Sequence, residues 1–296
     1  MVVEPDRWSR WLRERRDAGD ERQRTAILDM LGPVRERVLA NAEPLEGATL
    51  LDVGTGDGLI GLEALARVGP QGGVIFSDIS DALLAHAHEA VAAQGLLERA
   101  RFVSTQAEDL APIADQSVDA VTTRSVLIYV ADKAAAFGAM YRVLRPGGRI
   151  SLFEPINRLM FPEAPDRFWG YDVSAVSALA DKVKRSHREI SGPASATMLD
   201  FDDRDLVALA EAAGFSRVHL ECHIDVEVRG DSDAIDIQAL LDSAPNPLAP
   251  TARESIGAAL TAAESDEFVT HLRRAIEAGD RLRRSAVAYL AASKPN

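Results

Sequence analysis

The sequence is poor in cysteine and in positive charge, and it lacks any long apolar run. A single cysteine, Cys222, excludes a disulfide framework and any metal site built from several thiolates. Lysine and arginine number 33 against 46 aspartate and glutamate residues, and this net charge of −13 argues against a nucleic-acid groove. No stretch of about 18 apolar residues exists, so we expect no membrane span. The N-terminus has no basic segment followed by an apolar run, which predicts no signal peptide and a cytoplasmic protein.

The most informative stretch that is present covers residues 49–58, which read TLLDVGTGDG. Its apolar start predicts a buried strand, and its alternate glycines predict a tight loop. Helical apolar spacing resumes at Leu59, Leu62 and Leu65, so a helix should begin directly after the loop. Glycines at this place let the loop turn sharply and let its backbone come close to a ligand.

Two ligand classes compete for this loop. Residues 56–61 match G-x-G-x-x-G, the fingerprint of dinucleotide-binding proteins. However, the loop begins earlier, at Gly54, and the carboxylate of Asp52 would repel a pyrophosphate but suits a cationic ligand. The pattern D-x-G-x-G-x-G resembles motif I of class I S-adenosylmethionine-dependent methyltransferases. Their cofactor carries a sulfonium and an ammonium group and no phosphate.

Strand and helix patterns alternate after this stretch. Strands are expected at 73–77, 101–104, 118–122 and 149–154, with helices between them, which predicts a parallel sheet covered on both faces. A strictly alternating strand follows at 218–228, and a last strand is expected at 286–291. The resemblance implies that the last strand is antiparallel. We therefore predict an α/β, Rossmann-like doubly wound sheet, mostly parallel, with a helical N-terminal cap and inserted lid segments.

The 296 residues suffice for one full core and a smaller second lobe. Trp8, Trp11 and Leu12 share one helical face, and Gly32-Pro33 should break the second N-terminal helix. A 45-residue stretch after Pro155 should be a functional segment or have structure of its own. The expected parts are a helical cap at 1–45, a cofactor-binding core at 46–154, a lid or substrate insertion at 155–199, and a C-terminal part at 200–296 with a helical insertion near 231–284.

Several positions after strands suit a nucleoside ligand. Asp78 lies 20 residues after Gly58 at a strand end, where a carboxylate can accept hydrogen bonds from ribose hydroxyls. Gln106-Ala107 resembles the adenine-binding stretch of the methyltransferases, although an acid usually stands in place of Gln106. Arg124 could pair with a cofactor carboxylate, a substrate acid or a surface acid. The cofactor-binding set implied by the resemblance is Asp52, Gly54, Thr55, Gly56, Gly58, Asp78, Ile79, Gln106, Ala107 and Arg124.

The turn at 144–150, LRPGGRI, is very similar to the turn that precedes the fifth strand in the same family. The turn has a structural role, and we would not expect it in a dinucleotide-binding fold. Together with Asp52 and the late alternating strand, it favours the methyltransferase over the dinucleotide-binding interpretation.

Methyl transfer is a direct displacement at the sulfonium methyl, and a general base is optional. Candidates for such a base or another catalytic role are Glu154, His187 and Tyr129. Candidates for substrate contacts are Trp11, Arg158, Trp169 and Tyr171. No metal site is expected.

The sequence therefore predicts an enzyme that uses S-adenosyl-L-methionine, releases S-adenosyl-L-homocysteine and methylates oxygen or nitrogen. Its substrate would be a small organic molecule, a natural product or a peptide end, with no nucleic-acid or membrane partner. Oligomerisation stays open, as do two alternatives. One is an NAD-dependent oxidoreductase, and the other is a catalytically silent protein that binds S-adenosylmethionine.

Overall fold

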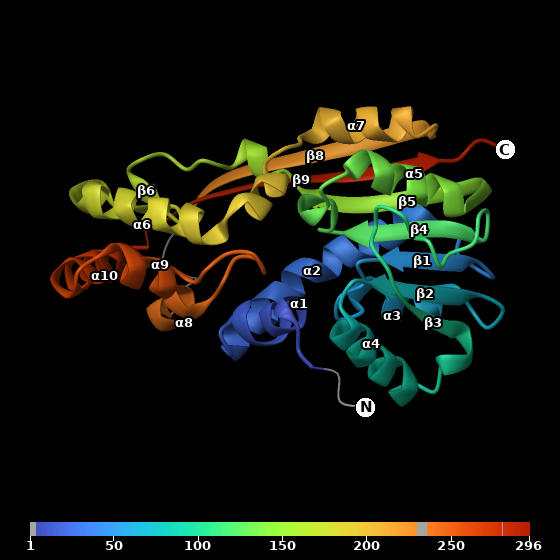
Figure 1. Ribbon diagram of the computed structural model, residues 1–296, viewed down its shortest axis with the longest axis horizontal. Coiled ribbons are helices and arrows are strands. Elements are labelled where there is room, and N and C mark those ends of the chain that lie inside the picture. Colours follow the sequence, from blue (N-terminus) through green and yellow to red (C-terminus); the bar gives the residue numbers. More distant parts are fainter. Residues whose placement is uncertain (1–3, 230–235, 280) are drawn as a thin grey trace.

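The computed structural model describes residues 4–229, 236–279 and 281–296. One nine-stranded sheet forms its centre, in the order β3-β2-β1-β4-β5-β9-β7-β6, with β8 paired to β9 (Figure 1). The strands are β1 Thr49–Val53, β2 Gly73–Asp78, β3 Ala100–Ser104, β4 Val118–Arg124, β5 Leu144–Pro155, β6 Arg167–Phe168, β7 Tyr171–Asp172, β8 Ser216–Arg229 and β9 Arg281–Ser293. Strands β1 to β5 pair in parallel, and β9 lies antiparallel to β5. The predicted Rossmann-like sheet with an antiparallel last strand is confirmed.

Helices cover both faces of the parallel strands. The helices of the core are α2 Glu21–Ala42, α3 Leu59–Arg67, α4 Asp81–Ala93, α5 Lys133–Val143 and α7 Asp203–Ala212, and short helical turns are η2 Leu97–Arg99 and η3 Leu127–Tyr129. Alternate residues of β1 serve opposite faces: Leu51 joins the apolar cluster with α5 and α7, whereas Leu50 joins the cluster with α2, α3 and α4. No helix in the described part of the chain is long and apolar enough to cross a membrane.

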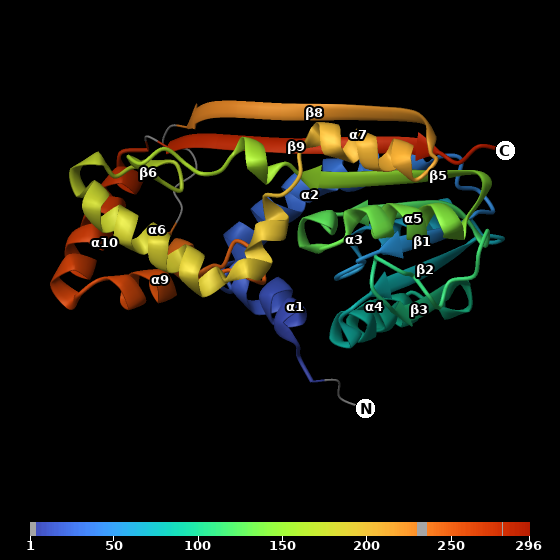
Figure 2. The same ribbon diagram turned by 45° about the horizontal axis from the view of Figure 1, so that its top comes forward.

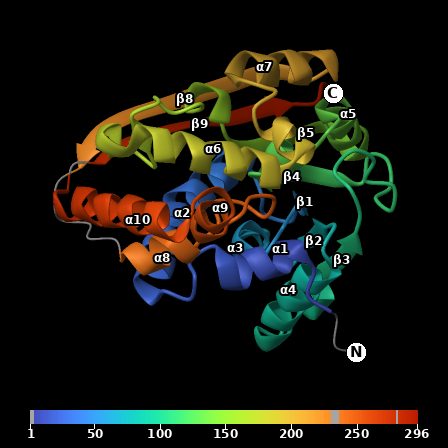
Figure 3. The ribbon, with the colours of Figure 1, turned by 60° about the vertical axis from the view of Figure 1, so that its left-hand side comes forward.

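A second lobe with its own core lies beside the sheet, where β8 and β9 extend past β5 (Figures 2 and 3). It contains β6, β7, η5 Ser174–Val176, α6 Ser177–Ser191, α8 Ile237–Asp242, α9 Ala252–Ala259 and α10 Ala262–Glu277. Two short turns, η4 Asn157–Leu159 and η6 Pro193–Met198, lie between the lobe segments and the sheet in the sequence, and Met198 packs against the core of the sheet. Phe168 and Val183 share this core with Leu241 and Phe268. The segments 155–199 and 231–284, which the sequence analysis treats separately, thus contribute to one apolar cluster. The residue boundaries of the parts stay a prediction.

The expected break at Gly32-Pro33 is wrong, because α2 continues through Pro33 to Ala42. Leu31, Val34 and Val38 are buried on the side of this helix that faces the core, so packing maintains the helix across the proline. The N-terminal pieces before it are α1 Arg7–Arg10 and the π-helical turn η1 Trp11–Arg15.

The last strand begins earlier than expected, at Arg281, where the sequence analysis still predicts helix. Residues 281–284 carry no apolar alternation of their own. They pair with residues 226–229 of β8, so antiparallel pairing with a neighbour fixes their conformation. The alternating strand at 218–228 is confirmed as part of β8.

The last glycine of the loop-and-helix stretch, Gly61, has a packing role. A Cβ at Gly61 would overlap the ring of Phe76 on β2, so α3 can approach the sheet only without a side chain there. Gly138 on α5 is the opposite case, because nothing lies within 4 Å of an added Cβ.

We predict opposite effects of alanine at these two glycines. Gly61→Ala should lower the free energy of unfolding by about 1 to 3 kcal/mol through overpacking. Gly138→Ala should raise it by up to about 1 kcal/mol through helix propensity. Urea denaturation followed by circular dichroism measures both. Equal changes in the two variants would contradict a packing role for Gly61.

Candidate functional site

A buried carboxylate anchors the glycine loop on the side that faces the core. Asp52 at the end of β1 is 1% exposed and accepts hydrogen bonds from the Thr55 hydroxyl at 2.7 Å, the Thr122 hydroxyl at 2.8 Å and the Gly61 N–H at 3.2 Å. Burial raises the pKa of Asp52 to about 6, and these hydrogen bonds counteract the rise. Asp52 therefore joins the loop, helix α3 and strand β4, and it does not line the pocket above them.

The loop itself runs with positive φ at Gly54, Gly56 and Gly58. A Cβ at Gly54 would overlap the side chain of Val126, which follows β4, so the loop and this segment are in direct contact. Gly54 and Gly56 line the pocket, whereas Thr55 and Gly58 do not. The backbone on the pocket side is thus free of side chains, as the glycine pattern predicts.

Asp78 at the end of β2 connects the neighbouring strand to this loop. Its two carboxylate oxygens accept the N–H groups of Gly56 and Ser80, each at 2.9 Å. Burial raises the pKa of Asp78, against the lowering effect of these backbone donors. The side chain is 8% exposed and lines the pocket, where its oxygens have lone pairs left for ligand hydroxyls.

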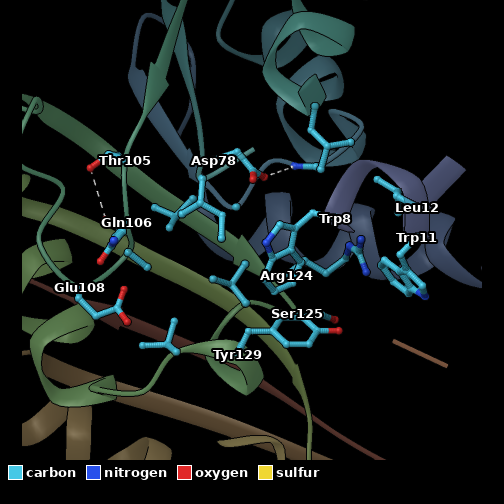
Figure 4. A pocket seen from close by; sticks show the side chains of 18 residues that line it. Trp8, Trp11, Leu12, Asp78, Thr105, Gln106, Glu108, Arg124, Ser125 and Tyr129 are labelled. Carbon is cyan, nitrogen blue, oxygen red and sulfur yellow. Dashed lines mark hydrogen bonds between the residues drawn. The ribbon is translucent and has the colours of Figure 1, made fainter. Parts of the chain in front are cut away.

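The pocket has a volume of about 300 Å³ and lies at the carboxyl ends of β1, β2, β3 and β4 (Figure 4). Ligands of open α/β sheets bind at this edge. Ile79, Gln106 and Ala107 line it, as do Arg124 and Val126. The structure thus brings together most of the cofactor residues implied by the sequence.

Arg124 is the cation of this pocket. Its guanidinium makes no hydrogen bond to the described residues, although Asp57, Asp52 and Glu154 act on it electrostatically. Burial lowers the pKa of Arg124, which reflects the cost of placing an unpaired cation there. A carboxylate ligand would relieve that cost through charge-assisted hydrogen bonds.

Glu154, a catalytic candidate, is fully buried and does not line the pocket. It accepts the N–H groups of Val126, Leu127 and Ile128 at 2.9, 3.0 and 3.4 Å. Burial raises the pKa of Glu154 to about 7, and these three donors oppose the rise. Its oxygens hold the start of η3, so Glu154 positions the turn that carries Tyr129.

Tyr129 does line the pocket, and burial raises the pKa of its hydroxyl, so it stays protonated at neutral pH. Its ring meets Trp8 edge to face at a centroid distance of 5.0 Å. Trp8 and Leu12 belong to α1 and η1, which form a wall of the pocket (Figure 4). The sequence indicates a shared helical face for both residues but does not mark either of them as a site residue.

Trp11, a substrate candidate, lines the pocket and also donates its indole N–H to the Ala244 carbonyl of the lobe at 2.9 Å. The other candidates lie elsewhere. His187 has its Nδ1 3.1 Å from the Ser255 hydroxyl, and Arg158 forms ion pairs with Asp202 and Asp205. Trp169 and Tyr171 pack in or against the lobe core.

The donor set of the pocket fits a nucleoside joined to an amino acid. Asp78 suits ribose hydroxyls, the segment at Gln106 and Ala107 suits a purine, and the guanidinium of Arg124 suits a carboxylate. S-Adenosylmethionine has these three groups. Within the described residues, no cluster of three or more histidine, cysteine, aspartate or glutamate side chains is arranged to hold a metal ion.

Comparison with known proteins agrees with this site. Residues 50–148 match the family described as a methyltransferase domain. The chain is 31% identical over 174 residues to the ubiquinone/menaquinone biosynthesis C-methyltransferase UbiE of Serratia proteamaculans, across 58% of this chain and 68% of that protein. The corresponding protein of Klebsiella pneumoniae is 32% identical over 174 residues, with the same two shares.

Solved structures show the same fold. A phosphoethanolamine N-methyltransferase of Haemonchus contortus, bound to S-adenosylhomocysteine, has a TM-score of 0.51 at 18% identity, covering 90% of this chain and 53% of that chain. The geranyl diphosphate C-methyltransferase of Streptomyces coelicolor has a TM-score of 0.50 at 16% identity, covering 88% and 77%. The cofactor is S-adenosylmethionine, and the chain belongs to the class I S-adenosylmethionine-dependent methyltransferases.

Proposed function

We propose that the chain methylates a small, largely apolar molecule whose acceptor carbon is activated by a neighbouring ionised hydroxyl, as in a phenolate or an enolate. The observation that carries the proposal is the wall of the pocket beside Arg124. Trp8, Leu12, Val126 and Tyr129 form an apolar and aromatic wall, and no described side chain on it is a free general base. Such a wall excludes water and favours a substrate that is reactive before it binds.

Each base candidate is unsuited to removing a proton at this wall. The oxygens of Glu154 are occupied by three backbone donors, and His187 lies in the lobe against Ser255. Tyr129 keeps its proton because burial raises the pKa of its hydroxyl, so it can donate a hydrogen bond to a substrate oxygen. None of these three candidates supplies a base at the wall, so the proposal takes a nucleophile that is already reactive.

S-Adenosylmethionine supplies an electrophilic methyl group, and its sulfur keeps the electron pair of the broken bond and becomes neutral. The electron pair of the activated substrate carbon forms the new bond. A phenolate ring carbon then loses its proton to solvent and the ring becomes aromatic again, whereas an enolate re-forms its carbonyl and loses no proton. The chain contributes alignment: Asp78 holds the ribose and Arg124 the carboxylate of the cofactor, and the aromatic wall holds the substrate ring in line.

Carbon is preferred over oxygen and nitrogen because the similar curated proteins are named C-methyltransferases. The expectation of an oxygen or nitrogen acceptor stays a prediction and is the direct competitor. Membership of the methyltransferase family removes the oxidoreductase alternative. A catalytically silent protein would bind the cofactor but give no product.

We predict that Asp78→Asn weakens S-adenosylmethionine binding by about 10- to 100-fold, because ribose hydroxyls lose an ionised acceptor. Asp81→Asn is the matched control, since Asp81 is exposed in the first turn of α4 and should leave affinity within about twofold. Isothermal calorimetry measures both, and equal melting temperatures would exclude a loop defect. Unchanged affinity in folded D78N would remove Asp78 from the site.

A second prediction separates the two ends of the cofactor. Arg124→Gln should weaken S-adenosylhomocysteine binding by about tenfold or more, because a charge-assisted pair is lost. The same variant should bind 5′-methylthioadenosine, which lacks the amino-acid end, as well as the unchanged protein does. Equal losses for both ligands would show that Arg124 supports the fold and not the carboxylate.

The acceptor atom is tested with methyl-¹³C-labelled cofactor and a panel of phenols, enolisable ketones, amines and carboxylic acids. We expect label bonded to carbon in nuclear magnetic resonance spectra of the product. Tyr129→Phe should reduce turnover by about tenfold, because one hydrogen bond to the substrate oxygen is lost, while cofactor affinity stays unchanged. Label on oxygen or nitrogen would overturn the choice of carbon. Cofactor binding without any product would favour the silent alternative.

A further inference from the structure

The strand β8 forms a long border of the sheet with an uncovered apolar stripe. In the described part of the chain it pairs only with β9, and Figure 2 shows it along the outer border. Ile224, Val226 and Val228 are 59%, 58% and 71% exposed. An exposed, apolar border strand of this length is a template for pairing with another strand.

The two halves of β8 differ in how they are covered. In the first half, Val218 and Leu220 pack against the cluster that includes Leu206 and Ala210 of α7. In the second half, α7 no longer lies over the strand, and residues 224–228 are all exposed (Figure 2). Cys222 lies midway between the halves, so a two-fold axis there would place the covered half of one strand beside the uncovered half of another.

We propose that β8 pairs antiparallel with β8 of a second copy of this chain, about a two-fold axis at Cys222. This register sets Ile224 opposite Leu220 of the partner copy, and Val226 beside Val218. Helix α7 of each copy then lies next to the bare stripe of the other. The sheet becomes continuous through both copies, and each stripe leaves the solvent.

The charges on the opposite face of the strand select this register. With the axis at Cys222, His219 lies opposite Asp225, and Glu221 lies opposite His223, each pair occurring twice. If the two-fold axis passed instead through any other residue from 221 to 226, two acidic side chains would lie opposite each other. With the axis at His223, for example, these are Glu221 and Asp225. Like charges directly opposite each other destabilise a strand pair. If the axis passed through a residue before 221, the position opposite Val226 would precede the start of β8, so Val226 would have no partner residue.

The register makes a geometric prediction about the single cysteine. Residues directly opposite each other in an antiparallel pair have Cα atoms about 4.5 to 5.5 Å apart, within the range that a disulfide spans. Oxidation with copper phenanthroline should therefore give a covalent dimer through Cys222 on a non-reducing gel. Burial raises the pKa of the Cys222 thiol, so the oxidation is run at mildly alkaline pH. Cys222→Ser should lose the cross-link and keep the dimer.

Light scattering and sedimentation equilibrium of the full chain measure the dimer directly. Val226→Lys should raise the dimer dissociation constant by about tenfold for each valine that no longer becomes buried. Ile190→Lys, at a 50% exposed aliphatic residue on α6, is the matched control and should leave the constant unchanged. Undiminished S-adenosylmethionine binding shows that V226K is folded.

The expected result is a dimer that Cys222 cross-links and V226K weakens. A monomer at every concentration would overturn the proposal, as would a dimer that V226K leaves intact. A dimer weakened by V226K but not cross-linked would overturn the register. The cross-link uses the unaltered chain, so this arm does not depend on the folding of any variant.

Discussion

The site depends on one buried carboxylate, that of Asp52. Its oxygens accept from Thr55 in the loop, Gly61 in α3 and Thr122 in β4, so three elements meet at one side chain. Burial alone would favour the protonated acid, and the hydrogen bonds offset part of that cost. The glycine loop is consequently held from the side of the core. On the side of the pocket its backbone can face a ligand without any side chain of its own.

Two further buried acids continue this arrangement along the sheet edge. Asp78 holds the loop through Gly56, and Glu154 holds the start of η3 through three N–H groups. The cofactor pocket is therefore built by carboxylates that order backbone, and only Asp78 also faces the ligand. Arg124 is the complementary case, a cation that has no hydrogen bond to any described residue, so that a ligand can supply one.

Much of the cofactor pocket could be predicted from the sequence, because it depends on local patterns and on short motifs. The loop, Asp78, Gln106-Ala107 and Arg124 all reach the pocket, since strand ends of a parallel sheet meet at one edge. Partner choice between distant segments could not be predicted. Apolar periodicity shows that Phe168 and Phe268 have a buried side, but not that they bury against each other. Nor does sequence show backbone donors, so the occupied oxygens of Glu154 looked free.

The lobe acts on the pocket without lining it. Trp11 donates to the Ala244 carbonyl, the Ala244 N–H donates to the Arg15 carbonyl at 2.8 Å, and Arg15 pairs with Glu254 at 2.6 Å. The same N-terminal helical segment presents Trp8 and Leu12 to the cofactor site. A shift of the lobe relative to the sheet must therefore move this wall or break those bonds. The position of this wall of the pocket is thus tied to the position of the lobe.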